Sequence, residues 1–122
     1  MITVLVVDGD PAVGLTIRRV LERAGFAVIA VPDGPTALRR LASLKMDLVI
    51  CEIEMPGPAG EAAIAEIGRA DPAARILALS HKDRAIRDAR HGTVAMLDKP
   101  FTESELLSMV RRSLARPAAR TP

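Results

Sequence analysis

Five short apolar runs alternate along the chain with five stretches of helical spacing. The runs cover residues 2–7, 27–31, 48–51, 76–79 and 94–97. Each run is continuous and does not alternate with polar residues, which indicates strands that are covered on both faces. Strands separated by helices predict a parallel sheet with helices on both sides, and right-handed crossovers limit the topology to a few doubly wound folds.

Two of the predicted helices carry clear start signals. Asp10 is suited to accept from backbone N–H groups as an N-cap, and Pro11 suits the first helical position. Gly25 can end that helix. The last predicted helix opens with a capping box, Thr102 and Glu105. The other three helices are expected after Asp33, over residues 60–67 and over about residues 83–91, and Pro117 is expected to stop the last one.

The length and composition predict one globular domain. The 122 residues are 49% hydrophobic and 26% charged, which is typical of a folded domain and not of a disordered tail. Two Phe and no Tyr or Trp make an aliphatic core the expectation. We expect a domain over residues 1–116 and a C-terminal tail over residues 117–122, which is also compatible with a domain taken from a longer protein.

The same composition argues against several functional classes. No apolar run approaches the roughly 20 residues that span a bilayer, and no basic leader precedes the first run. A single cysteine, Cys51, excludes an internal disulfide, so a cytoplasmic location is expected. The net charge is +2 and there are no aromatic residues suited to base stacking, so we expect neither a membrane nor a nucleic acid as partner.

Polar residues gather where the predicted strands end. In doubly wound folds the ligand crevice lies beyond the carboxyl ends of the strands. A single polar residue there would simply reach water, but several converging residues favour a site or the remnant of one. These residues are Asp8, Gly9 and Asp10 after the first strand, Glu52 after the third, Ser80 and His81 after the fourth, and Lys99 after the fifth.

Four stretches of this sequence resemble the response-regulator receiver family of two-component signalling. They read VLVVDGDPAVG (4–14), DLVICEIEMPGPAG (47–60), ILALS (76–80) and MLDKPF (96–101). The resemblance covers about residues 2–116. It implies a flavodoxin-like α/β fold, with a doubly wound parallel sheet of five strands in the order 2-1-3-4-5.

The resemblance also implies a phosphorylation site. In the family, an aspartate ending the third strand takes a phosphoryl group from a histidine kinase, and two adjacent acids after the first strand hold Mg²⁺. A Ser or Thr and a Lys contact the phosphoryl oxygens, and an aromatic residue three positions before the Lys reports the state to partners. The corresponding residues here are Asp8 and Gly9 for the acid pair, Glu52 for the phosphoacceptor, Ser80 and Lys99 for the contacts, and Met96 for the switch.

The departures from that pattern bear on the chemistry. Mg²⁺ demands near-octahedral oxygen geometry, and Gly9 supplies no side-chain oxygen, while Asp10 is expected to cap the helix. Asp8 and Glu52 are the residual metal candidates, so we expect weak or lost Mg²⁺ binding and no cofactor. Glu52 carries one methylene more than Asp, and a misplacement of roughly 1 Å can cost about 100-fold in rate.

These observations predict a pseudo-receiver that acts by protein contact, not as an enzyme and without a phosphorylation cycle. Glu52 then either imitates the phosphorylated state or forms an inert salt bridge with Lys99, and both interpretations stay open. The expected partner is a histidine kinase, another regulator, or a second copy bound through the fourth helix, fifth strand and fifth helix. The alternatives are a receiver that accepts phosphate slowly and a flavodoxin-like domain that binds a small ligand.

Overall fold

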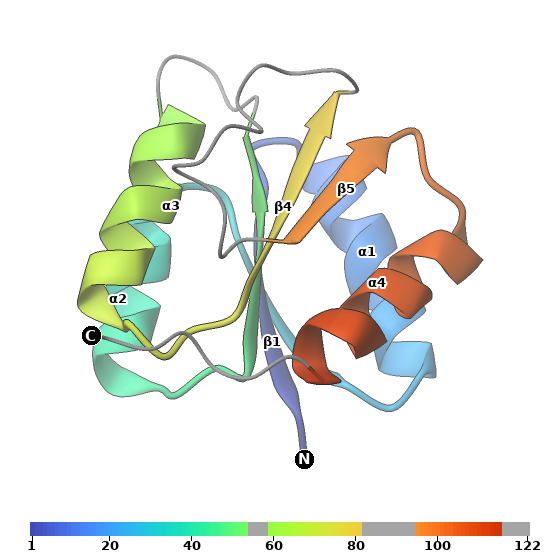
Figure 1. Ribbon diagram of the computed structural model, residues 1–122, viewed down its shortest axis with the longest axis horizontal. Coiled ribbons are helices and arrows are strands. Elements are labelled where there is room, and N and C mark those ends of the chain that lie inside the picture. Colours follow the sequence, from blue (N-terminus) through green and yellow to red (C-terminus); the bar gives the residue numbers. More distant parts are fainter. Residues whose placement is uncertain (54–58, 82–94, 116–122) are drawn as a thin grey trace.

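A computed structural model of the protein describes residues 1–53, 59–81 and 95–115. Five parallel strands form one sheet in the order β2-β1-β3-β4-β5 (Figure 1). This arrangement confirms the predicted flavodoxin-like sheet and its strand order. The strands are β1 (Thr3–Val7), β2 (Ala27–Val31), β3 (Leu48–Glu52), β4 (Ile76–His81) and β5 (Ala95–Lys99).

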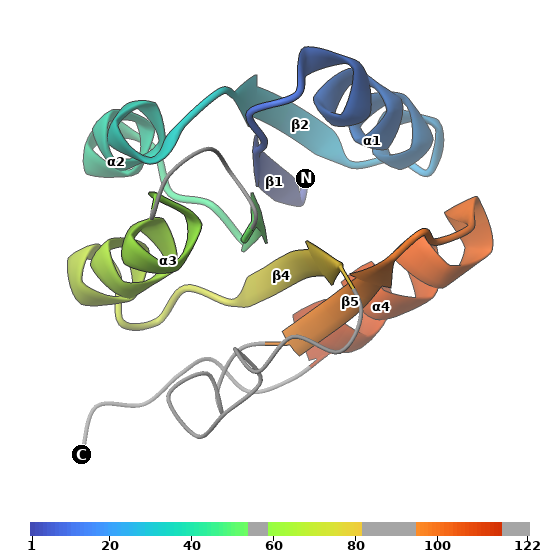
Figure 2. The same ribbon diagram turned by 90° about the horizontal axis from the view of Figure 1, so that it is seen from above.

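Helices cover both faces of this sheet. One face carries α1 and α4, and the opposite face carries α2 and α3, as the views in Figures 1 and 2 show. The predicted fourth helix, at about residues 83–91, lies outside the described residues, so the predicted fifth helix is labelled α4. The bounds are α1 (Pro11–Arg23), α2 (Gly34–Ser43), α3 (Ala59–Ala70) and α4 (Glu103–Ala115).

The predicted helix ends are confirmed by their hydrogen bonds. The Asp10 carboxylate accepts from the backbone N–H of Ala12 at 3.0 Å, and Pro11 is the first residue of α1. At the start of α4, the Thr102 N–H donates to Glu105 at 2.8 Å, and the Glu105 N–H donates to the Thr102 hydroxyl at 3.0 Å. Gly25 follows α1 with a φ of +99°, a conformation that glycine adopts without strain.

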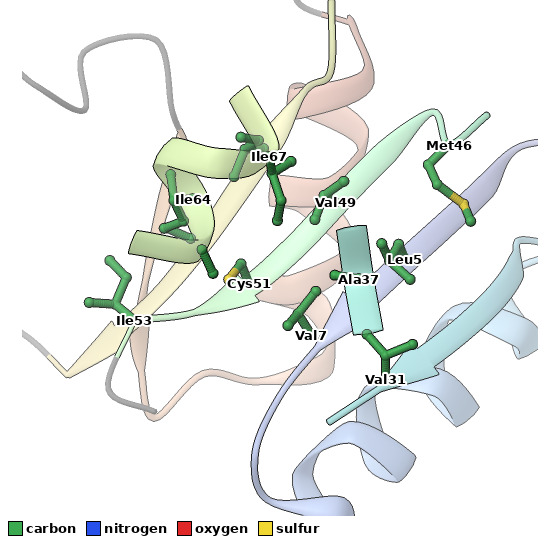
Figure 3. Packing of buried hydrophobic residues seen from close by; sticks show 13 residues of the cluster. Leu5, Val7, Val31, Ala37, Met46, Val49, Cys51, Ile53, Ile64 and Ile67 are labelled. Atoms are coloured by element: carbon green, nitrogen blue, oxygen red, sulfur yellow. The ribbon is translucent and has the colours of Figure 1, made fainter. Parts of the chain in front are cut away.

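Alternate residues of each strand enter two separate aliphatic cores. Figure 3 shows the core between the sheet and the pair α2 and α3, to which Leu5, Val49 and Ile67 belong. The core on the other face packs against α1 and α4. Its fully or almost fully buried members include Val4, Val6, Ile17, Leu21, Leu48, Ile50, Leu77, Leu79, Leu106 and Val110.

The structure corrects several predicted boundaries. β3, β4 and β5 extend to Glu52, His81 and Lys99, so these residues belong to the strands and do not follow them. Continued pairing is the reason, because His81 is in register with Lys99. α2, which was expected after Asp33, ends at Ser43, and Leu44 lies past its end with extended backbone and is 44% exposed.

Candidate functional site at the carboxyl edge of the sheet

Three charged residues meet at the carboxyl edge of the sheet. Asp8 directly follows β1, Glu52 ends β3, and Lys99 ends β5. Parallel pairing of neighbouring strands carries all three to the same edge. Asp8 and Glu52 are only 6% and 5% exposed. The predicted convergence of these residues is therefore present, with both carboxylates buried.

Glu52 and Lys99 form an ion pair. The Lys99 Nζ contacts Glu52 Oε2, which links β5 to β3 across the end of β4. The side chains are 19% and 6% exposed, so water screens this pair less than a surface pair. Removing one partner of a buried pair leaves an uncompensated charge, which typically costs about 3–5 kcal/mol. The pair therefore ties the ends of the two strands together.

Asp8 has a different environment. Its Oδ1 accepts from the backbone N–H of Asp10 at 2.8 Å. Its Oδ2 is buried and accepts no hydrogen bond from the residues that the structure describes. Burial raises the pKa of Asp8 above its usual 3.8, although the Asp10 hydrogen bond and the positive charge of Lys99 act in the opposite direction. One oxygen of this acid is thus left for a further partner.

The two residues after Asp8 add no ligand beside it. Gly9 has no side chain, and the Asp10 carboxylate is exposed and engaged at the start of α1. The predicted capping role of Asp10 is confirmed by that hydrogen bond. Asp8 is therefore the single acid of the Asp8-Gly9-Asp10 segment that is buried at the strand edge.

The site fits Mg²⁺ poorly. The ion takes six oxygen ligands in near-ideal octahedral geometry. Asp8 Oδ2 is one suitable oxygen, but the Glu52 carboxylate is already paired with Lys99. Across residues 1–53, 59–81 and 95–115, no group of three His, Cys, Asp or Glu side chains is placed to hold a metal. The described residues therefore do not form a complete set of metal ligands.

The remaining predicted site residues lie in or next to the strands. Ser80 is fully buried in β4, one position before its end. Met96, at the predicted switch position, is half-buried in β5. It packs against the aliphatic core between the sheet and the pair α2 and α3. Burial raises the pKa of the Cys51 thiol to about 12, and the nearby Asp8 charge adds to this effect. Cys51 is therefore a core residue and not a reactive thiolate.

One feature beside the site was not predicted from the sequence. A cavity of about 360 Å³ lies between α1 and β2, and Asp8 is part of its lining. Gly14, in the interior of α1, also lines it. A glycine inside a helix is unfavourable by about 1 kcal/mol relative to alanine. The presence of Gly14 inside the predicted first helix was therefore the sequence signal that could have indicated the cavity.

The described part of the chain contains no helix long and apolar enough to span a membrane.

Residues 4–111 match the response regulator receiver domain family. The DNA-binding transcriptional regulator NtrC of Rhizobium meliloti is 31% identical over 121 residues, covering 97% of this chain and 25% of NtrC. The transcriptional activator protein IrlR of Burkholderia pseudomallei is 31% identical over 120 residues, covering 96% of this chain and 52% of IrlR. The chain thus spans about a quarter to a half of these relatives.

Solved structures agree with the sequence match. The response regulator TrrA of Thermotoga maritima, in complex with Mg²⁺-BeF, superposes with a TM-score of 0.83 at 29% identity, covering 93% of this chain and 99% of TrrA. TrrA bound to the histidine kinase ThkA gives the same TM-score and identity, with 94% and 100% covered. The chemotaxis protein CheY4 of Vibrio cholerae shares the fold with a TM-score of 0.85 at 24% identity, covering 93% of this chain and 98% of CheY4. With this sheet order and this match over residues 4–111, the chain belongs to the response regulator receiver domain family.

Proposed function

We propose that this receiver domain signals through protein contacts and without a phosphorylation cycle. The observation that carries the proposal is the buried ion pair between Glu52 and Lys99. Phosphoryl transfer depends on the position of the acceptor carboxylate and on neutralisation of the charge of the moving phosphoryl group. In this chain the carboxylate at the acceptor position and the neighbouring lysine neutralise each other.

The environment of Asp8 supports the same proposal. Gly9 stands where the family has a second acid, so the site lacks one carboxylate that would hold a metal. Phosphoryl transfer relies on positioning and electrostatic stabilisation, and displacement of the acceptor by about 1 Å costs on the order of 100-fold. The extra methylene of Glu52 and the absent ligand at position 9 both lower the expected rate of phosphoryl transfer. The chain then functions as a binding protein and not as an enzyme, without a metal cofactor.

The proposed partner is a histidine kinase or another regulator of the same signalling system. A histidine kinase is bound to TrrA, which is 29% identical to this chain. A homodimer through β5, α4 and the predicted fourth helix is the alternative partner. The DNA-binding function in the name of NtrC belongs to a protein about four times as long, so we propose no nucleic-acid contact for this chain. We place its action in the cytoplasm.

The Glu52–Lys99 pair has two alternative roles within this proposal. In the first, Glu52 imitates a phosphorylated acceptor, because it brings negative charge to Lys99. In the second, the pair only holds the strand ends together. Partner binding by a Glu52→Gln variant separates them, because loss of affinity is expected in the first case and unchanged affinity in the second.

The first prediction concerns covalent phosphorylation. With acetyl phosphate and Mg²⁺, intact-mass spectrometry is expected to show no phosphoryl adduct on the wild-type chain. The double variant Gly9→Asp, Glu52→Asp restores both the acid pair and the shorter acceptor, and it is expected to gain the adduct. The matched control Gly9→Asp, Glu52→Asn has no acceptor carboxylate and is expected to gain none. A stable adduct on wild-type Glu52 at ordinary rates would refute the proposal.

A second candidate function is a receiver that accepts phosphate slowly. The Oδ2 of Asp8 favours it, because this oxygen has no hydrogen-bond donor among the described residues and offers one ligand to a divalent ion. Slow phosphorylation would then appear on Glu52 after long incubation, would depend on Mg²⁺, and would disappear in an Asp8→Asn variant. Absence of any adduct on the wild-type chain after long incubation would exclude this candidate, and an adduct that survives Asp8→Asn would show that Asp8 is not required for it.

A further inference from the structure

β2 forms an open edge of the sheet. Within the described residues it pairs with β1 alone, and Figure 2 shows it on the outer side of β1, between α1 and α2. The backbone groups of Ala27 and Val31 bond to the residues that flank β1, so the alternate residue Ile29 also faces β1. The residues between them, Val28 and Ala30, therefore direct their N–H and C=O groups outward.

This edge lacks the features that usually prevent pairing with another chain. Exposed sheet edges in proteins are commonly interrupted by charged side chains, proline or a bulge. β2 reads AVIAV, without a charged residue or a proline, and it pairs with β1 residue by residue from Ala27 to Val31. Ala30 is exposed, and Pro32 comes only after the strand. A further strand can therefore add along this edge.

A second copy of the chain fits this edge by symmetry. When two β2 strands pair antiparallel about a two-fold axis at Ile29, Val28 of one copy lies opposite Ala30 of the other. These are the residues whose backbone groups face outward, so each such pair exchanges both of its N–H···O bonds. Ile29 then lies opposite Ile29 of the other copy, between the hydrogen-bonded pairs. The same patch thus serves both copies, as a closed two-fold contact requires.

The side chains at this edge are apolar on both faces of the sheet. Val28 belongs to the core beside α1 and α4, and Ile29 packs against the core beside α2 and α3. Ala30 is small, which leaves room for the valine opposite it. Ala30 also lines the cavity of about 360 Å³ together with Leu15, which is 45% exposed. Antiparallel pairing would cover this exposed apolar surface.

The charges next to the edge favour an antiparallel arrangement. The exposed acid Asp33 caps the start of α2, near the end of β2, and the last turn of α2 carries the exposed Arg40. A two-fold axis perpendicular to the sheet places the α2 helices of the two copies on the same face in opposite directions. The Asp33 end of one helix then lies toward the Arg40 end of the other. Opposite charges arranged in this way orient association and fix its register.

We propose that two copies of the chain associate through their β2 edges into one continuous sheet. This contact differs from the face of β5, α4 and the predicted fourth helix considered above, because β2 and β5 are opposite edges of the sheet. It does not depend on whether Glu52 accepts a phosphoryl group.

Cysteine crosslinking of the intact chain tests the register. The two-fold pairing places the Cα atoms of the two Ile29 residues about 4.5 Å apart, within the range of about 4.4–6.8 Å that a disulfide bridges. Ile29→Cys is therefore expected to form a covalent dimer on mild oxidation, which a non-reducing gel detects. In the matched control Ala27→Cys, the two thiols lie about 13 Å apart along the strands, so no dimer is expected. The wild-type chain, whose Cys51 is fully buried, is expected to give none either.

Sedimentation equilibrium tests the contact without a crosslink. The average mass of the wild-type chain is expected to approach twice its 13.0 kDa as the concentration rises toward about 1 mM. Ala30→Lys places a charge on the edge and is expected to keep the chain monomeric. Ser108→Lys places the same charge at an exposed position of α4 and is expected to leave the dimer intact.

A second edge variant protects the test against misfolding. Ala30→Pro removes an N–H that faces outward and keeps the hydrogen bonds to β1, which is the position where an edge strand tolerates proline. It is also expected to be monomeric. Circular dichroism establishes that each variant is folded.

The proposal is overturned by a wild-type chain that stays monomeric up to about 1 mM. It is also overturned by a dimer that persists in a folded Ala30→Lys or Ala30→Pro variant, or by one that Ser108→Lys disrupts, which would place the contact at α4. Equal crosslinking of Ile29→Cys and Ala27→Cys, or assemblies that grow beyond the dimer, would contradict the two-fold register.

Discussion

Two buried carboxylates at the same sheet edge are compensated in different ways. Glu52 has the ammonium of Lys99, whereas Asp8 has one backbone N–H at Oδ1 and no donor at Oδ2 within the described residues. Burial without full compensation disfavours the charged form of an acid. Protonation of Asp8 and folding are therefore coupled.

The pKa of Asp8 predicts how its replacement changes stability with pH. Because this pKa is raised above 3.8 in the folded state, the folded chain binds more protons than the unfolded chain, and the stability contributed by Asp8 falls as pH rises through the folded pKa. Asp8→Asn is therefore expected to increase the free energy of unfolding at neutral pH. The gain is expected to vanish as the pH falls below 3.8, as measured by urea unfolding at several pH values.

Asp33 provides a control of opposite sign. Hydrogen bonds from Thr36 lower the pKa of Asp33, so its contribution to stability is present above pH 3.8 and is lost as pH falls through the folded pKa. Asp33→Asn is therefore expected to lose stability at neutral pH and to match the wild type in acid. A pH-independent difference for Asp8→Asn would show that burial of its charge is not the cause.

At the scale of the element, capping groups determine where α1 and α4 begin. The first N–H groups of a helix have no partner within the helix, and Asp10 and Thr102 each satisfy one of them. For Asp10 this has a functional consequence, because its Oδ1 is engaged by the Ala12 N–H at the helix start. Because α1 uses Asp10 as its N-cap, fewer carboxylates are left for the site beside Asp8.

The capping box of α4 gives a prediction at this scale. Thr102→Ala removes the acceptor of the Glu105 N–H and is expected to lower the free energy of unfolding by about 1 kcal/mol. Ser108→Ala is the matched control, because Ser108 is an exposed residue in the interior of the same helix, where alanine is favourable. Denaturant unfolding measures both variants, and equal stability of Thr102→Ala and the wild type would show that the box contributes nothing.

At the scale of the whole molecule, the sheet separates two aliphatic cores. Ile17 on α1 belongs to one core and Ile67 on α3 to the other, and both are buried to 99% or more. The strands contribute side chains to both cores, so each core depends on the same backbone. The two layers are therefore expected to unfold together, although their side chains do not touch across the sheet.

This arrangement predicts additive core substitutions. Ile17→Val and Ile67→Val are each expected to cost about 0.5–1.5 kcal/mol. The double variant is expected to lose the sum of the two, within about 0.5 kcal/mol, because sites without shared contacts rarely couple. Leu44→Ala, at a position that is 44% exposed, is the near-neutral control. A coupling well above that margin in thermal or urea unfolding would mean that the two cores are not independent.

The sequence alone was enough to predict the architecture and the edge of the sheet at which Asp8, Glu52 and Lys99 lie. Continuous apolar runs and helical spacing are local patterns, and they predicted a parallel sheet covered by helices on both faces. The strand order that the structure has was implied by the resemblance to the receiver family. Capping residues are local too, so Asp10, Thr102 and Glu105 were correctly placed. Strand ends in a parallel sheet share an edge, which made the convergence of Asp8, Glu52 and Lys99 predictable. The fourth helix and the tail stay predictions, because they lie outside the described residues.

Only the tertiary structure decided how these residues interact. The Glu52–Lys99 pair was one of two open interpretations, because it depends on the distance between the ends of strands 47 positions apart in the chain. Two features were not predicted at all: the Asp8 Oδ2, which accepts no hydrogen bond within the described part of the chain, and the cavity that Asp8 lines. Both features arise only when α1 packs against β2. Local sequence patterns do not indicate where such packing leaves empty space or a buried oxygen without a nearby donor.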